Sequence, residues 1–184
     1  MKRIRRVAAY IVLGLIAPFV AGTQEPAERS AQLSPFVVDS LAPLLAGWIA
    51  SARDAAKAQG VEPIPSTIRA ALTGYVPEQV LDKVRWREGG TELSLPQNVI
   101  RFGEVPAMTL DDVVVFQDRR VALEDPKLWA HELKHVMQFA AWGIDGFATR
   151  YLSDYQAVED EAWEFRWQFM KEAGLIPEVP SPTE

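Results

Sequence analysis

The chain has 184 residues, of which 48% are hydrophobic and 24% are charged, and it contains no cysteine. This composition is that of a globular protein, which excludes collagen-like and wholly disordered chains. The lack of cysteine excludes disulfides, thiol nucleophiles and cysteine-ligated metals. With 25 acidic and 19 basic side chains the net charge is −6, which argues against a nucleic-acid partner. The length suffices for one domain with its own hydrophobic core.

The first 22 residues have the order of a secretory signal sequence. Four basic residues precede an apolar run of about fifteen residues, and Val20-Ala21-Gly22 suits cleavage. The alternative is an uncleaved membrane anchor, but the run is shorter than the roughly 20 residues of a span, and Pro18 interrupts it. We therefore expect residues 1–22 to be removed. The product would be secreted or periplasmic, with a net charge of −10 and no stable membrane span.

A long helix is predicted after a flexible linker at residues 23–33. It begins at Ser34, which can cap it, and ends at Gly60, and its apolar residues recur at helical spacing. Pro43 should kink or split this helix. Two shorter helices are expected to follow, at Ser66–Gly74 and Pro77–Val84.

The sequence then changes to short β-prone runs. Runs rich in valine and aromatic residues are separated by Gly89-Gly90, Pro96 and Pro106, which is typical of strands joined by turns. We expect a small sheet of about three strands. The runs are Val84–Arg87, Asn98–Phe102 and Val113–Gln117.

Helical sequence resumes at Asp125, which can cap a helix with proline in its first turn. This helix is expected to span residues 126–142. A loop, Gly143–Leu152, should lead to a last helix, Ser153–Gly174, which the capping box Ser153-Asp-Tyr-Gln156 opens.

These elements predict a single α+β domain over residues 34–174, mainly helical, with its small sheet before the helix that begins at Pro126. Residues 175–184 contain three prolines and are expected to form a disordered tail.

The predicted helix 126–142 contains the motif His131-Glu132-Leu133-Lys134-His135. At 3.6 residues per turn, histidines four residues apart lie on one helix face, so both imidazoles can bind one Zn²⁺. Glu132 is placed to reach a metal-bound water and to act as a general base. The alternative is two surface histidines on a solvated face.

A catalytic zinc site usually has three protein ligands and a water. Only two histidines exist, so the third ligand must be a carboxylate. A buried acid on an apolar helix face needs a metal or a partner, but helical periodicity does not decide between the acids present. The candidates are Asp145, Asp154, Glu159, Asp160, Glu161 and Glu164.

The stretch Leu128-Trp-Ala-His-Glu-Leu-Lys-His-Val-Met-Gln138 has the form HEL-x-H-x-x-Q, and Val84-Arg85, the stretch Ala107–Phe116 and the stretch Tyr151–Ala162 add further similarity. With these features the chain from about Pro63 to Arg166 resembles the extracellular contractile injection system core domain. The resemblance implies a zincin-like domain and a zinc-dependent peptidase.

The resemblance also bears on the third ligand. In gluzincin-like enzymes the ligand glutamate is typically followed by alanine at the third place and aspartate at the fourth. Glu159 with Ala162 fits this frame, which makes Glu159 the first choice and Glu161 the reserve. Trp163 departs from this frame, since relatives have an aspartate at this place, and that aspartate usually orients the first histidine. The substitutes would be Asp160, Asp154 or a backbone carbonyl.

Three more side chains have two interpretations each. Gln138, three residues after His135, either supports the site or packs in the core. Tyr151 and Tyr155 either donate a hydrogen bond to an oxyanion or anchor a helix by packing. We leave all three outside the predicted site.

The sequence thus predicts a secreted zinc metallopeptidase. His131, His135 and Glu159 would bind Zn²⁺, and Glu132 would activate the water that attacks a peptide or protein substrate. The oligomeric state stays open. The alternative from another class is a catalytically silent binding or scaffold module of the cell envelope with a structural or vestigial zinc site, although Glu132 argues against it. Hydrolysis of a non-peptide amide is a third interpretation.

Overall fold

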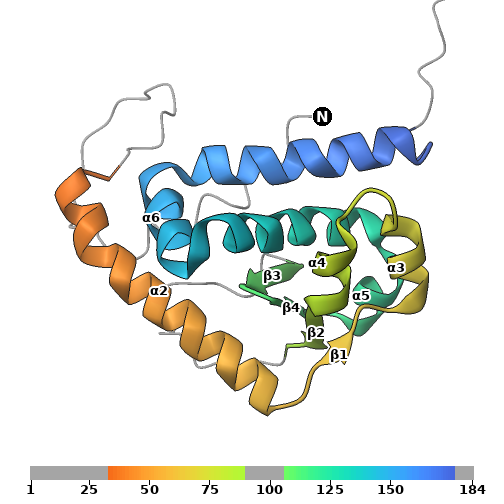
Figure 1. Ribbon diagram of the computed structural model, residues 1–184, viewed down its shortest axis with the longest axis horizontal. Coiled ribbons are helices and arrows are strands. Elements are labelled where there is room, and N and C mark those ends of the chain that lie inside the picture. Colours follow the sequence, from red (N-terminus) through yellow and green to blue (C-terminus); the bar gives the residue numbers. More distant parts are fainter. Residues whose placement is uncertain (1–32, 90–105, 177–184) are drawn as a thin grey trace, which may run out of the picture.

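The computed structural model describes residues 33–89 and 106–176. Within these ranges, helices surround a small four-stranded sheet, so the mainly helical α+β class is confirmed (Figure 1). The expected signal peptide, the expected strand Asn98–Phe102 and most of the linker and tail lie outside the described residues.

The helix predicted from Ser34 forms as α2 (Pro35–Ala58). Pro43 lies inside α2 without ending it, so the predicted split is wrong. Pro43 and Asp39, whose carbonyl loses its helical partner, are both exposed, and water can therefore satisfy that carbonyl. The opposite face of α2 is buried and consists of Val38, Ala42, Ala46, Ile49, Ala52 and Ala56.

The longest element, α6 (Pro126–Glu172), has non-helical backbone angles at Gly143 and Asp154. These two breaks divide α6 into a first segment (126–142), a middle segment (144–153) and a last segment (155–172). The middle segment turns the chain, so that the last segment runs back along the first (Figure 1).

The first segment forms as predicted, whereas the predicted loop Gly143–Leu152 is wrong. Asp125 caps the first segment by accepting a hydrogen bond from the Lys127 backbone N–H at 3.0 Å. Gly143 was predicted to end the helix, but the residues between the breaks are helical because their apolar side chains pack against the rest of the domain. These side chains are Ile144, Phe147, Ala148, Tyr151 and Leu152.

The cap of the last segment lies one residue later than predicted. Asp154 is its cap, since its Oδ1 accepts a hydrogen bond from the Ala157 backbone N–H at 3.1 Å. The Ser153 hydroxyl instead donates to the Thr149 carbonyl of the middle segment at 2.7 Å. The predicted capping box at Ser153 is therefore wrong.

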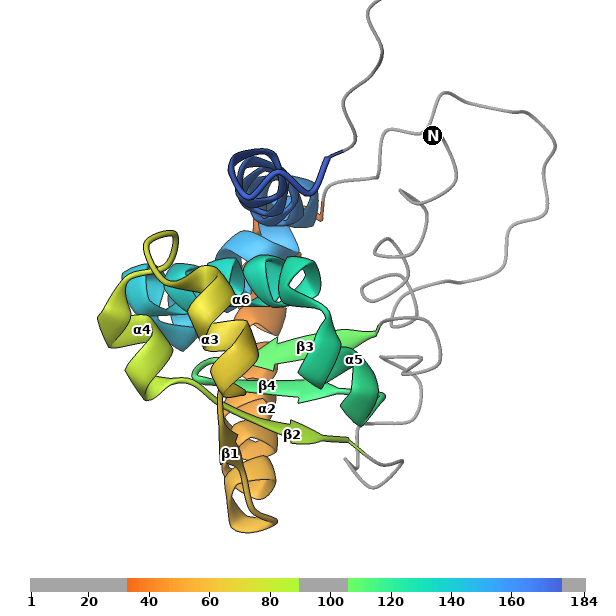
Figure 2. The ribbon, with the colours of Figure 1, turned by 90° about the vertical axis from the view of Figure 1, so that its right-hand side faces the viewer.

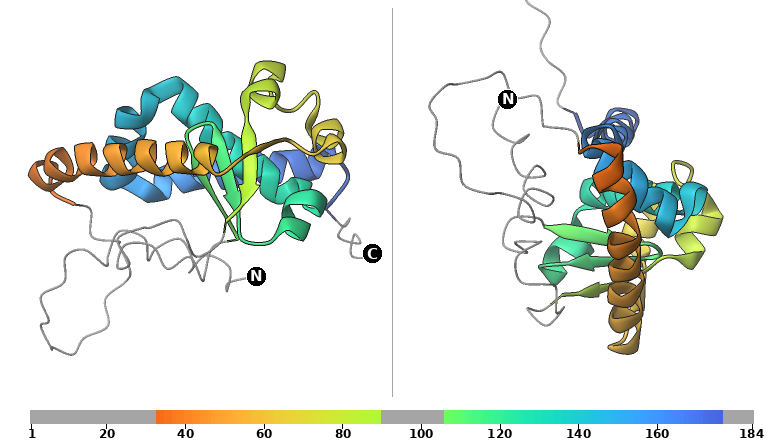
Figure 3. Two further views of the ribbon diagram at one scale, coloured as in Figure 1. Left: turned by 90° about the horizontal axis from the view of Figure 1, so that it is seen from below. Right: turned by 90° about the vertical axis from the view of Figure 1, so that its left-hand side faces the viewer.

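The buried face of α2 packs against α6. Val38, Ala42 and Ala46 form a cluster with Ala148 and Leu152 of the middle segment, and α2 extends from this cluster to the sheet (Figure 3). Among the described residues α2 is also the one helix long and apolar enough to cross a membrane. Its 18-residue window has a mean hydropathy of 1.4 and is 28% buried. In the structure, its small side chains allow close contact with α6.

The strands are β1 (Glu62–Pro63), β2 (Arg85–Glu88), β3 (Ala107–Leu110) and β4 (Val113–Phe116), in the order β1-β2-β4-β3. β2 and β4 are parallel, and the other two pairings are antiparallel. β2 and β4 overlap predicted strands. β1 and β3 were not among the predicted runs, because β1 has two residues and β3 has one β-branched residue, Thr109.

The sheet is covered on both faces. All four residues of β4 are buried, which explains their unbroken apolar sequence. On one face the rings of Trp86, Phe116 and Trp129 contact one another. On the other face Val113 and Val115 pack with residues of α2. α6 lies along the β3 edge (Figure 2), and this brings β3 next to the HExxH motif.

Three short helices complete the described fold. α3 (Ser66–Leu72) and α4 (Glu78–Lys83) lie within the two ranges predicted for them. α5 (Arg119–Glu124) was not predicted, because six residues are too few to show a helical period. Its start is set by Asp118, which accepts a hydrogen bond from the Arg120 backbone N–H at 2.7 Å.

Candidate metal centre

Three predicted ligand side chains meet between the first and last segments of α6. His131 and His135 come from the first segment, and their Nε2 atoms are 3.2 Å apart. Glu159 comes from the last segment, with Oε2 3.5 Å from His131 Nε2 and Oε1 3.6 Å from His135 Nε2. Each histidine is 7% exposed. His131, His135 and Glu159 therefore form a candidate metal-binding group.

The spacing of these atoms fits a tetrahedral metal shell. With metal–ligand bonds of about 2.0–2.2 Å, neighbouring ligand atoms of a tetrahedron lie roughly 3.3–3.6 Å apart. The two Nε2 atoms are 3.2 Å apart, and each lies 3.5 or 3.6 Å from a different oxygen of the Glu159 carboxylate, which is close to this range. Three protein ligands are the number that a catalytic zinc site usually has, and the described residues supply three.

The two histidines belong to a stretch that is similar to a known family. Over residues 63–143 the chain resembles the eCIS core domain. The match contains both histidines and Glu132, and it ends where the first segment ends rather than at Arg166. Glu159 lies outside the match, so its role as a ligand stays a prediction. No curated protein and no solved structure matches the chain.

Glu132, inside the eCIS core match, is buried but is not one of the three converging groups. The Thr109 hydroxyl on β3 donates a hydrogen bond to its carboxylate Oε2 at 2.8 Å. The Glu132 backbone carbonyl is 3.2 Å from the same hydroxyl. Sequence analysis missed Thr109, because its contact with Glu132 joins a strand to a helix 23 residues away and no local spacing signals it.

The charges of the site stabilise one another. Burial acts to lower the pKa of His131, but its hydrogen bond to Glu159 and the charges of Glu132 and Glu159 outweigh burial and raise that pKa above 6.5. For Glu159, burial acts to raise the pKa. His131, His135 and Tyr151 outweigh this effect and hold the pKa of Glu159 below 4.5. The protonated form of His131 and the ionised form of Glu159 therefore favour each other in the metal-free protein.

Gln138 contacts both ligand-bearing segments and is 2% exposed. Its Oε1 lies 2.8 Å from His135 Nδ1, and its Nε2 donates to the Val158 carbonyl at 3.0 Å and to Glu161 Oε2 at 3.1 Å. Glu161 also pairs with Lys134 at 3.2 Å. The structure therefore places Glu159 beside the histidines and places Glu161, the reserve ligand, with Gln138 and Lys134.

The two histidines are supported unequally. Within the described part of the chain, His131 Nδ1 is buried and has no hydrogen-bond partner. Trp163 packs against the His131 ring, with the ring centroids 4.8 Å apart. The aspartate that usually orients the first histidine is replaced by Trp163, and neither Asp154 nor Asp160 bonds to His131 Nδ1 in its place. Asp154 caps the last segment, and Asp160 bonds to Gln156.

Tyr151 supports a ligand instead of facing outward. Burial and the negative charge of Glu159 raise the pKa of its hydroxyl, so it stays protonated, and it forms a hydrogen bond with Glu159. Its ring stacks with Phe147, which in turn contacts the edge of His135. Tyr155 contacts Tyr151 at 6.4 Å between ring centroids. Asp145 and Glu164, the remaining candidate acids, are exposed and are not in the group.

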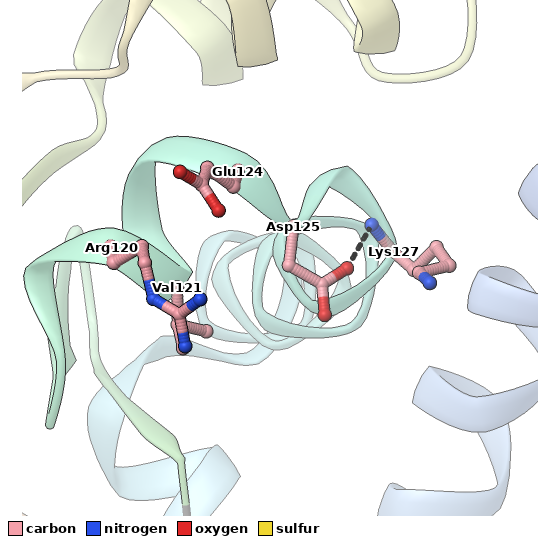
Figure 4. A pocket seen from close by; sticks show the side chains of 5 residues that line it. All are labelled: Arg120, Val121, Glu124, Asp125 and Lys127. Carbon is pink, nitrogen blue, oxygen red and sulfur yellow. Dashed lines mark hydrogen bonds between the residues drawn. The ribbon is translucent and has the colours of Figure 1, made fainter.

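Two surface cavities lie away from the metal-binding group. The larger, of about 260 Å³, is at the junction of α5 and α6 (Figure 4). It is lined by Arg120, Val121, Glu124, Asp125 and Lys127. A second, of about 170 Å³, lies between Tyr75 and the last segment. Asp125 in the larger cavity is occupied in capping the first segment, and neither cavity is lined by a residue of the metal-binding group.

Proposed function

We propose that the protein is a secreted, zincin-like zinc metallopeptidase in which His131, His135 and Glu159 hold Zn²⁺. The observation that carries the proposal is the convergence of His131, His135 and Glu159. The two Nε2 atoms are 3.2 Å apart and lie 3.5 and 3.6 Å from the two Glu159 oxygens, and the buried Glu132 is next to His131 in the chain but is not part of this group. A purely structural zinc site uses four protein ligands and needs no neighbouring base.

Two imidazoles and one carboxylate also suit iron. The i, i+4 spacing of the histidines with a glutamate after the first is the arrangement of zinc hydrolases, in which that glutamate has a use. Zinc is therefore the metal proposed, and elemental analysis of the purified protein is the direct test.

When bound, Zn²⁺ supplies a Lewis acid that polarises a peptide carbonyl and acidifies a water. Glu132 takes a proton from the attacking water and returns it to the leaving amine. The hydrogen bond from Thr109 holds the Glu132 carboxylate in place between these two transfers. Tyr151 and Gln138 hold Glu159 and His135 through hydrogen bonds.

A metal-stabilised binding module is the second candidate function. The low exposure of the group favours it, since both histidines are 7% exposed and a peptide must reach them. In this case the metal would join the first and last segments of α6 and Glu132 would have no catalytic use.

The Glu132→Gln variant separates the two candidates. It keeps size and hydrogen bonding but removes the base, so a peptidase should keep one zinc per chain and lose hydrolysis of an unfolded protein substrate by about 10²-fold or more. Glu164→Gln, at an exposed glutamate of the last segment, is the matched control. Equal hydrolysis by wild type and Glu132→Gln would contradict the peptidase and favour the binding module.

A further inference from the structure

We propose that Gln138 is a positioning residue, which holds His135 in the tautomer that leaves Nε2 free to bind a metal. The use of this tautomer in metal binding rests on the proposed function, whereas the tautomer itself follows from the hydrogen bonds of Gln138. Gln138 lies one turn after His135 on the first segment and reaches across to the last segment.

The partners of Gln138 determine how its amide is oriented. The Val158 carbonyl and the Glu161 carboxylate only accept hydrogen bonds, and both lie at the Nε2 end of the amide, at 3.0 and 3.1 Å. The amide NH₂ must therefore face them. Its oxygen then faces His135 Nδ1 at 2.8 Å, and because an amide oxygen only accepts, Nδ1 must carry the proton.

This proton position decides which nitrogen can bind a metal. A neutral imidazole carries a single N–H, so a proton on Nδ1 leaves the Nε2 lone pair bare. Nε2 is the atom that faces His131 and Glu159, at 3.2 and 3.6 Å. Gln138 is 2% exposed, so water does not compete for these hydrogen bonds. The same amide fixes the backbone at Val158, next to Glu159, and so aligns ligands from both segments.

The contrast with His131 shows why this support matters. Among the described residues no group bonds to His131 Nδ1, so its tautomer is not set from outside the group. Outer-shell partners of a metal-binding histidine fix its tautomer and ring orientation. Among the described residues, Gln138 is the one side chain that bonds to the Nδ1 atom of either histidine, so Gln138 alone can fix a histidine tautomer in this way.

Two substitutions separate positioning from packing. Gln138→Met fills nearly the same space but cannot accept a hydrogen bond. Gln138→Glu keeps an acceptor for His135 but loses the donor to Val158 and places a second carboxylate beside Glu161, which lowers stability. Packing alone predicts that Met is tolerated and Glu is harmful to the site. Positioning predicts that Glu keeps the His135 tautomer and Met does not.

The experiment is long-range ¹H–¹⁵N NMR of the histidine rings in the metal-free full chain, at a pH where both rings are neutral, together with zinc titration against a competing chelator. We expect the Nδ1–H tautomer for His135 in wild type and in Gln138→Glu. For Gln138→Met we expect a mixture of tautomers and a zinc affinity lower by about 10–100-fold. Gln156→Met, at an exposed glutamine that bonds to Asp160, is the control and should match wild type.

An unchanged His135 tautomer and zinc affinity in Gln138→Met would overturn the proposal. If wild type binds no zinc, the proposed function fails, while the tautomers of wild type and Gln138→Met still decide the role of Gln138. If Gln138→Met does not fold, Gln138→Glu decides, because loss of the Nδ1–H tautomer there overturns the proposal and its retention supports it.

Discussion

The first and last segments of α6 both supply ligands to the candidate metal centre, but they are held in different ways. The first segment is enclosed: Trp129, Ala130 and Leu133, which precede and follow His131, are completely buried. The last segment covers the site with one buried face and leaves Trp163 and Trp167 40% and 54% exposed. The histidines are therefore placed by the core, and Glu159 by the turn that returns the last segment.

This difference separates a local part of the site from a tertiary part. The separation of His131 and His135 is set by one turn of helix and survives wherever the helix forms. The position of Glu159 depends on the breaks at Gly143 and Asp154 and on the packing of the middle segment. Loss of a histidine should therefore affect metal binding most, and disturbance of the turn should affect it least.

Removal of a first-segment ligand should have the largest effect. We expect one zinc per chain in wild type and none retained after dialysis in His131→Ala or His135→Ala, because these are the two nitrogen ligands of the group. Elemental analysis measures this directly. Stoichiometric zinc in the double alanine variant would show that the metal binds elsewhere.

Removal of the last-segment ligand should weaken zinc binding without abolishing it. Glu159→Ala leaves the histidine pair, and its loss of affinity should exceed the 10–100-fold that is usual for outer-shell changes. Glu161→Ala is the comparison two residues away. It removes contacts to Gln138 and Lys134 but no predicted ligand, so its loss of affinity should be the smaller one. If Glu161→Ala released the metal and Glu159→Ala did not, the ligand would be assigned to the wrong glutamate.

The pH dependence of the metal-free protein tests whether the two segments share a proton. The pKa of His131 is raised above 6.5, so its contribution to stability is complete below 6.5 and is lost as pH rises through the raised value. The pKa of Glu159 is lowered from 4.5, so its contribution is present above 4.5 and is lost as pH falls through the lowered value.

The metal-free protein should therefore melt at a higher temperature near pH 5.5 than near pH 8, because a pH of about 5.5 lies between the lowered pKa of Glu159 and the raised pKa of His131. Thermal melting in a chelating buffer measures it. Glu159→Gln should remove most of the difference, since His131 then loses the partner that raises its pKa. With zinc the order should reverse, because protons compete with the metal for His131.

The same division between local and tertiary features explains what the sequence could predict. The HExxH helix and its cap at Asp125 depend on neighbouring residues, and both were predicted. Thr109 and the bonding of Gln138 across to Val158 depend on contacts between elements, which spacing does not reveal. Glu159 was chosen through a family resemblance, because periodicity alone did not separate it from Glu161.

The middle segment is where local signals misled. Gly143 favoured a loop, and it does have a positive φ, of 70°, but it provides only the first break, and helix resumes after it. The helical spacing of Phe147, Ala148 and Leu152 outweighs Gly146 because all three are buried in the structure. Burial against α2 was not available to a local interpretation of the sequence.

The second break gives the smallest expected effect and the finest test of how the last segment is positioned. Asp154→Ala removes the side-chain oxygen that accepts from the Ala157 N–H, which should cost about 1 kcal/mol of the free energy of unfolding, as for other helix caps. Ser153→Ala removes a hydroxyl that bonds back to Thr149 within the middle segment, a type of bond that adds little to a helix, and it should be nearly neutral. Urea unfolding of both variants measures the difference.

Zinc affinity should fall only slightly in Asp154→Ala, because Glu159 lies beyond the first turn and the metal itself joins the segments. If Ser153→Ala were the more costly change, the helix would begin at Ser153 and Glu159 would have to reach the histidines from a different start of its helix.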